Sequence, residues 1–230
     1  MLKKIFNLYK ILRKLAVSGA PDVIDEIKPL PGFFKFIFSI FSLGTKSKYD
    51  IENKTSGEKL CAALQGMGTT FIKLGQFLAT RPDIIGDEIA KNLERLQDKL
   101  PAFSTNEAKE IIKKEIGVKS YNEIISIDEP VAAASIAQVH FIKIKVKNGE
   151  KNLALKVLRP NIHKIVNEEL DALMFLAYLI ENFFRKTKRL KLVEVIHLLK
   201  EITNVEMDLR FEAAAASELY EKTKNDNFIK

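Results

Sequence analysis

Tryptophan is absent from this 230-residue chain, and cysteine occurs only once, at position 61. A single cysteine excludes an internal disulfide and fits a reducing, cytosol-facing compartment. The three histidines, at positions 140, 163 and 197, are scattered, so the sequence shows no ligand cluster of zinc type and predicts no metal site. Hydrophobic residues make up 47% and charged residues 29% of the chain, which excludes a disordered polymer and indicates a folded protein.

Positive charge is concentrated at the N-terminus. Residues 1–48 contain nine Lys or Arg and only three acids, so they carry nearly all of the net charge of +7. Ile5, Leu8, Leu12 and Leu15 follow helical spacing within residues 2–17, and basic residues fill much of the rest. This basic amphipathic helix suits either an anionic membrane surface or docking on its own domain. Because the basic residues are not spread along a folded face with aromatic platforms, we expect no nucleic-acid partner.

The next segment, "PLPGFFKFIFSIFSLG" (29–44), is strongly aromatic, but after Lys35 it stays uncharged for only ten residues. A membrane-spanning helix needs about 20, so we expect this segment to lie at an interface or to be buried. Together, residues 1–55 are predicted to form membrane-proximal helices at the cytoplasmic side of the inner membrane, attached peripherally.

The rest of the chain predicts an α+β fold that is mainly helical. Residues 45–57 are polar and indicate a linker, and helical patterns cover 58–80, 86–97 and 104–116. Residues 124–158 change to strand character, with a hairpin expected around Asn148-Gly149. Helices are expected again at 162–186 and 190–222. We divide the chain into residues 1–55, a helical region 56–120 and a sheet-containing region 121–230.

A lysine in this hairpin suggests chemistry. Lys156 lies in the strand that ends "ALKVLRP", after an alanine-rich loop, Ala132, Ala133, Ala134 and Ser135. This order matches the start of a kinase small lobe, where a loop covers phosphates and a strand lysine contacts them. A lysine in an apolar strand is costly unless it is paired, so Lys156 predicts a carboxylate partner. Ordinary kinase spacing favours Glu168 or Glu169.

Three stretches, "FIKLGQFLATRPD", "AAASIAQVH" and "ALKVLRP", resemble in this order the UbiB family of atypical protein-kinase-like proteins of ubiquinone biosynthesis. The resemblance runs from Gly66 to Lys230. It implies a K-x-G-Q helix packed on a kinase-like small lobe, in which Lys73 and Gln76 face a nucleotide pocket. It also implies that Glu206 and Asp208 form the E-x-D motif that meets this helix, and that Glu212, rather than Glu168 or Glu169, pairs with Lys156.

The same resemblance assigns the nucleotide-binding role to the loop Ala132–Ser135 together with Lys156 and Glu212. Lys73, Gln76, Glu206 and Asp208 take a supporting role. The expected cofactor is ATP with magnesium, and the expected partners are the nucleotide, an anionic membrane surface, and ubiquinone-biosynthesis proteins or lipid precursors.

The chain departs from the family in two respects. It contains no D-x-H-P-G-N or D-F-G motif, so it has no catalytic aspartate and no magnesium ligands of that kind. The hydrophobic tail common in the family is also missing. The sequence therefore predicts the front part of a UbiB protein, with the large lobe absent. Two interpretations stay open: a nucleotide-binding half-site of an ATP-dependent kinase or ATPase, and a non-catalytic, membrane-peripheral scaffold.

Overall fold

The structure is a computed structural model of the 230-residue chain, and it describes residues 2–27, 32–43, 55–96 and 100–226. Much of the expected linker 45–57 lies outside these residues. The described elements, in chain order, are α1 (Leu2–Val17), α2 (Ala20–Ile27), α3 (Gly32–Ser42), α4 (Ser56–Met67), α5 (Thr69–Ala79), α6 (Pro82–Ile85), α7 (Asp87–Leu93), α8 (Thr105–Tyr121), β1 (Ile124–Ala133), β2 (Ala137–Val146), β3 (Gly149–Leu158), α9 (Ile162–Phe183), the 3-10 helix η1 (Arg185–Leu190), α10 (Leu192–Met207) and α11 (Leu209–Thr223).

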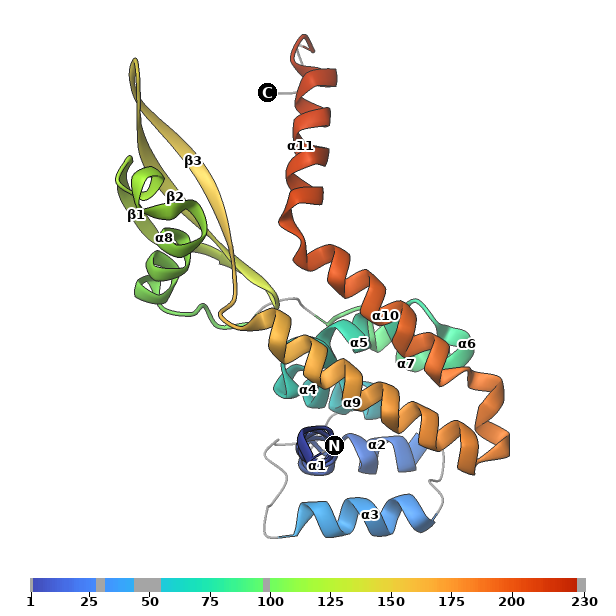
Figure 1. Cartoon of the computed structure of the whole chain (residues 1–230). Helices are drawn as coiled ribbons and strands as arrows, with labels where there is room; N and C mark the ends of the chain where they lie inside the picture. Colours follow the sequence, from blue (N-terminus) through green and yellow to red (C-terminus); the bar gives the residue numbers. More distant parts are fainter. Residues whose placement is uncertain (1, 28–31, 44–54, 97–99, 227–230) are drawn as a thin grey trace.

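Helices form the body of the molecule, and two arms rise from it (Figure 1). One arm is the sheet with α8 beside it, and the other is the single helix α11. The body contains α9 and α10 side by side, with α4, α5, α6 and α7 behind them and α1, α2 and α3 at the base. The expectation of a mainly helical α+β fold is confirmed.

The sheet has three antiparallel strands in the order β1-β2-β3. The predicted hairpin is the β2–β3 pair, in which Val146 pairs with Gly149 across a turn of Lys147 and Asn148. Gly149 has a φ of 123°, a backbone conformation that glycine adopts far more readily than other residues. The turn therefore lies one residue earlier than the Asn-Gly pair suggested.

The first strand, β1, corrects the expected extent of the alanine-rich loop. Ala132 and Ala133 belong to the end of β1, and only residues 134–136 connect it to β2. We call residues 134–136 the alanine turn. The pairing of β1 with β2 shifts register between Ile124 and Ser126, and again once before and once after Pro130. These irregularities disrupt the strict alternation by which a strand is recognised in sequence.

Two helices that the sequence pattern presents as continuous are broken. Gly68, with a φ of 92°, separates α4 from α5, and Asp208 separates α10 from α11. Residues 58–80 and 190–222 are helical, as predicted. The prediction that each forms one continuous helix was wrong. The breaks matter because they turn α5 and α11 in directions that the longer helices would not have allowed.

The hydrophobic core runs through the body and draws on helices that lie far apart in sequence. It includes Ile11 of α1, Val23 of α2, Phe71 of α5, Leu170 of α9 and Leu199 of α10. α1 therefore docks on the body by one face, which agrees with the interpretation of residues 2–17 as a helix that packs on its own domain. None of the helices in the described ranges combines the length and the apolarity needed to cross a bilayer. The division at residues 55 and 120 stays a prediction.

Candidate functional site

Two lysine–carboxylate ion pairs lie at the junction of α10 and α11. Lys73 Nζ on α5 lies 3.0 Å from Glu206 Oε2 near the end of α10. Lys156 Nζ on β3 lies 2.6 Å from Glu212 Oε2 in the first turn of α11. The body and the sheet therefore each contribute one cation to the same helix junction.

The pair on α5 is the less exposed of the two. The Lys73 side chain is 13% exposed and Glu206 is 37% exposed. α5 is positioned by Phe71, which is fully buried, while Leu74 packs against the core from the side. A lysine at such a position needs a carboxylate, because desolvating an unpaired ammonium group is costly. Gln76 lies half-buried on the same helix, three residues beyond Lys73.

Three glutamates, Glu168, Glu169 and Glu212, were candidates for the partner of Lys156. The structure pairs Lys156 with Glu212 across 56 residues of sequence. Glu169 is instead bound to Lys14 of α1, with Nζ and Oε1 2.6 Å apart, and Glu168 is half-buried on α9. The pairing that the family resemblance implied is therefore present, and its role in nucleotide binding stays a prediction.

Asp208 takes a local role between the two pairs. Its carboxylate accepts a hydrogen bond from the Arg210 backbone N–H at 3.1 Å and so caps the N-terminus of α11. The Arg210 guanidinium donates to both Asp208 oxygens, at 2.8 and 2.5 Å. The hydrogen bonds from this side chain lower the pKa of Asp208 to about 2. Asp208 thus sets the break that separates Glu206 from Glu212.

Three polar residues near the alanine turn, Gln138, His140 and Arg159, were not predicted from the sequence. Gln138 and His140 are buried on one face of β2, and Arg159 follows β3. Gln138 bonds both the N–H and the C=O of Phe103, while His140 Nδ1 lies 2.8 Å from the Asp128 carbonyl oxygen. Two polar residues at alternate positions of an otherwise apolar strand face were the signal that could have indicated them.

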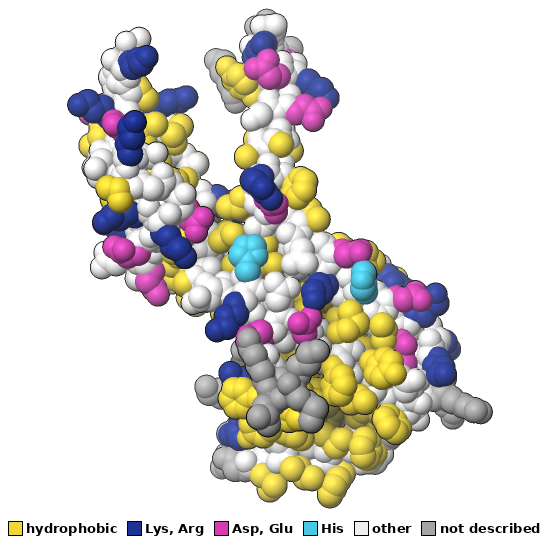
Figure 2. Space-filling model, in the orientation of Figure 1, with side chains coloured by type: hydrophobic (Ala, Val, Ile, Leu, Met, Phe, Trp, Pro, Cys, Tyr) yellow, Lys and Arg dark blue, Asp and Glu magenta, His cyan; other side chains and the backbone are white. Residues whose placement is uncertain are grey.

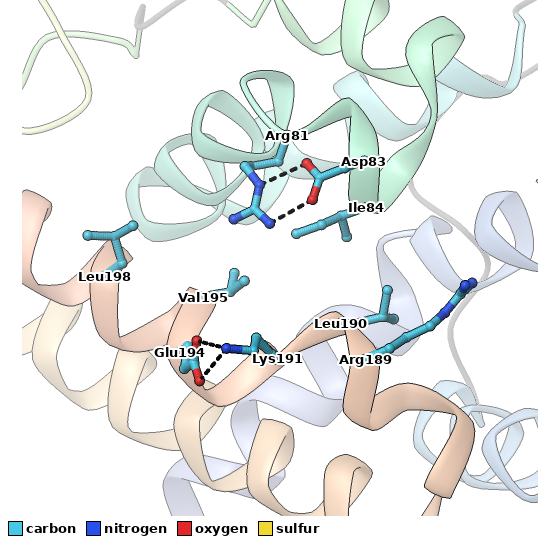
Figure 3. A pocket seen from close by; sticks show the side chains of 9 residues that line it. All are labelled: Arg81, Asp83, Ile84, Arg189, Leu190, Lys191, Glu194, Val195 and Leu198. Atoms are coloured by element: carbon cyan, nitrogen blue, oxygen red, sulfur yellow. Dashed lines mark hydrogen bonds and ion pairs between the residues drawn. The ribbon is translucent and has the colours of Figure 1, made fainter.

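Arg81 and Asp83 of the Arg-Pro-Asp stretch line a separate cavity of about 350 Å³ between α6 and α10 (Figure 3). Its polar lining includes the Arg81 guanidinium bonded to both Asp83 oxygens, at 2.8 and 2.7 Å, the ion pair of Lys191 with Glu194, and Arg189. The residues predicted for the site do not line this cavity, nor a second one of about 320 Å³ beside Lys14 and Gly68. The Arg-Pro-Asp stretch therefore begins α6 and does not join the lysine pairs.

A nucleotide fits these residues only in part. Two ammonium groups and a tight strand turn are the elements that bind phosphates in kinase-like lobes. For magnesium the fit fails, because Glu206 and Asp208 are turned to Lys73 and Arg210. No group of three His, Cys, Asp or Glu side chains within the described ranges is placed to hold a metal ion.

Comparison with known proteins agrees with these motifs. Residues 95–230 match the model of the ABC1 atypical kinase-like domain. The chain is 40% identical over 224 residues to a protein named "Probable protein kinase UbiB" from Histophilus somni, which covers 96% of this chain and 40% of the relative. It is 34% identical over 231 residues to the protein of that name from Shewanella piezotolerans, covering 99% of this chain and 41% of the relative.

A third relative with this name, from Marinobacter nauticus, is 37% identical over 174 residues, or 75% of this chain and 31% of the relative. The chain thus spans about two fifths or less of the length of these relatives. Kinase-type relatives imply ATP and magnesium as the general cofactors of the whole proteins. With more than half of its residues inside the family model, the chain belongs to the ABC1/UbiB family of atypical kinase-like proteins, of which it represents a portion.

Proposed function

We propose that this chain supplies the phosphate-facing half of an ATP site in a UbiB-type kinase or ATPase that supports ubiquinone biosynthesis. The observation that carries the proposal is the pairing of Lys156 on β3 with Glu212 on α11. In kinases this pair places the strand lysine where it meets the α- and β-phosphates. Lys73, held by Glu206 at the same helix junction, adds a second positive charge.

The residues of this half-site bind and orient but do not complete a reaction. Lys156 and Lys73 neutralise phosphate charge, and Glu212 and Glu206 hold the two ammonium groups in place. Stabilising the charge that develops during phosphoryl transfer also requires magnesium and an aspartate that positions the acceptor. Neither motif that supplies them in this family occurs in the 230 residues.

The test is nucleotide binding measured separately from turnover. Isothermal titration of the purified 230-residue chain should detect ATP binding, while a steady-state phosphate-release assay should show negligible hydrolysis. Absence of binding at millimolar ATP would reject the half-site. Hydrolysis at a rate typical of kinases, about 1 per second or more, would show that the chain supplies catalytic groups that we have not identified.

We propose further that α1 and α3 rest on an anionic membrane, which is the alternative, scaffold-type role. Phe33, Phe36, Ile40 and Leu43 follow at spacings of three and four residues and are between 47% and 72% exposed. Hydrophobic side chains gather at the base of the molecule, where α2 and α3 lie (Figure 2). A contiguous apolar face of this kind marks a surface that contacts a membrane or another protein.

The charges around this face favour a membrane. Lys10 and Arg13 of α1 are exposed, and the Lys10 ammonium group lies 4.5 Å from the centre of the exposed Phe6 ring. Amphipathic helices with aromatic and basic residues in this arrangement bind anionic lipid headgroups. Lys14 does not belong to this set, because it is turned inward to Glu169 and to the ring of Phe71.

Vesicle flotation tests the membrane proposal. Changing Phe33 and Phe36 to serine should reduce binding to vesicles that contain phosphatidylglycerol by about tenfold or more, because two exposed aromatic side chains no longer enter the interface. Phe141→Ser is the matched control, since Phe141 is similarly exposed but lies on the sheet. Equal binding by all three proteins, or binding that does not depend on the anionic lipid, would contradict the proposal.

A further inference from the structure

The alanine turn, residues 134–136, is held by two other parts of the chain as well as by its own strands. Within the turn, the Ala134 N–H donates to the Ala137 carbonyl at 2.8 Å. Ser135 is fully buried, which is unusual for a loop that would have to close over phosphates. Hydrogen bonds from outside the turn reach it from Arg159 and from the first residue of α5.

Arg159, the residue that follows β3, bonds the turn with its guanidinium group. Its Nε and Nη2 donate to the Ala134 carbonyl oxygen at 3.0 and 2.8 Å, and its Nη1 donates to the Pro101 carbonyl oxygen at 3.0 Å. The Arg159 backbone N–H donates to the Ile136 carbonyl at 2.9 Å, and the guanidinium carbon lies 5.9 Å from the centre of the Phe103 ring. Charge-assisted hydrogen bonds of this kind are about twice as strong as neutral ones.

Thr69 holds the turn from the body. Its Oγ1 donates to the Ser135 carbonyl oxygen at 2.8 Å, in a bond that is buried and joins residues 66 positions apart. Thr69 is the first residue of α5, and Lys73 follows one helical turn later on the same side of that helix. α5 therefore bonds the alanine turn at its N-terminus and the α10–α11 junction through Lys73.

We infer that Thr69 and Arg159 are positioning residues: Thr69 fixes the alanine turn to the N-terminus of the K-x-G-Q helix, and Arg159 fixes it to the end of β3 and to Pro101. The turn then moves with α5 rather than closing independently on a ligand, as a glycine-rich loop does. Lys73 and the turn thereby keep a constant separation. This inference concerns the geometry of the turn, and its effect on ATP binding rests on the proposed function.

Hydrogen exchange of the chain without nucleotide tests the inference directly. Thr69→Val removes the hydroxyl with little change in shape and should speed exchange in a peptide that covers residues 131–138 by about tenfold. Thr69→Ser restores the donor and should restore protection. Thr203→Val is the matched control, because the buried Thr203 hydroxyl bonds the Leu199 carbonyl of its own helix, at 2.7 Å.

Arg159→Lys provides a second variant that keeps the charge but loses the fork, and it should also speed exchange in residues 131–138. Exchange in α9 reports whether either variant has lost its fold. If Thr69→Val and Arg159→Lys leave the exchange of this peptide at the rate of Thr203→Val, the inference is wrong. If the unaltered chain binds no ATP but exchange changes as expected, the half-site is rejected and the positioning role stands.

Discussion

Replacing Lys156 with methionine should weaken ATP binding about tenfold or more and leave the free energy of unfolding changed by less than about 1 kcal/mol. Affinity falls because a positive charge that meets phosphate is removed while the stem of the side chain is kept. Stability changes little because Lys156 and Glu212 are 35% and 61% exposed, and exposed ion pairs contribute about 0–1 kcal/mol. Titration calorimetry and urea denaturation measure the two quantities.

The chain contains a closely matched control for this variant. Lys200 pairs with Asp171 at 2.6 Å, with side-chain exposures of 34% and 62%, but it joins α10 to α9 away from the sheet. Lys200→Met removes an ion pair of the same length and exposure and should leave ATP binding unchanged. If the two variants lose affinity equally, the effect of Lys156 is one of net charge, and the pair with Glu212 is not part of a phosphate site.

Replacing Gly75, the glycine of the K-x-G-Q stretch, with valine should lower the free energy of unfolding by about 3 kcal/mol, the upper end of the usual cost of overpacking. A Cβ atom at this position would lie 2.3 Å from Leu96 Cδ1 and 2.8 Å from Leu64 Cδ1. α5 therefore packs closely on its neighbours at Gly75 and leaves no room there for a branched side chain. Urea denaturation of the variant measures the loss.

Gly32→Val serves as the control, since among the described residues, apart from the neighbouring backbone, no atom lies within 4 Å of the position that a Cβ would take there. Gly75→Ala should cost less than valine, because the ends of two leucine side chains can shift to admit one methyl group. A Gly75→Val protein with unchanged stability and lost ATP binding would instead place this glycine against the nucleotide.

Contacts within a few residues could be predicted from the sequence more readily than contacts between elements. The amphipathic pattern of residues 2–17 predicted α1, and the alternation around the turn at residues 147–148 predicted the β2–β3 hairpin. The breaks at Gly68 and Asp208 were missed, because one glycine or one aspartate inside a helical pattern is compatible with a continuous helix. Yet an aspartate before an apolar run is also the ordinary signal of a helix N-terminus, and Asp208 uses it.

Partners of the site residues could not be predicted from spacing. Glu212 lies 56 residues from Lys156, beyond two helices, so ordinary kinase spacing selected Glu168 and Glu169 instead. Only the resemblance to a known family indicated Glu212. The roles of Thr69 and Arg159 depend on a backbone carbonyl as the partner, and side-chain sequence contains no signal for such a contact.

Because the Lys14 side chain points into the body, N-terminal truncation of this protein should affect its fold. A version that starts after Val17 would leave the carboxylate of Glu169, 16% exposed, without its counter-ion and would uncover the aromatic ring beneath that lysine. α1 is therefore part of the folded body through Lys14. A force applied to the outer surface of α1 would therefore also act on α5, through the contact of Lys14 with Phe71.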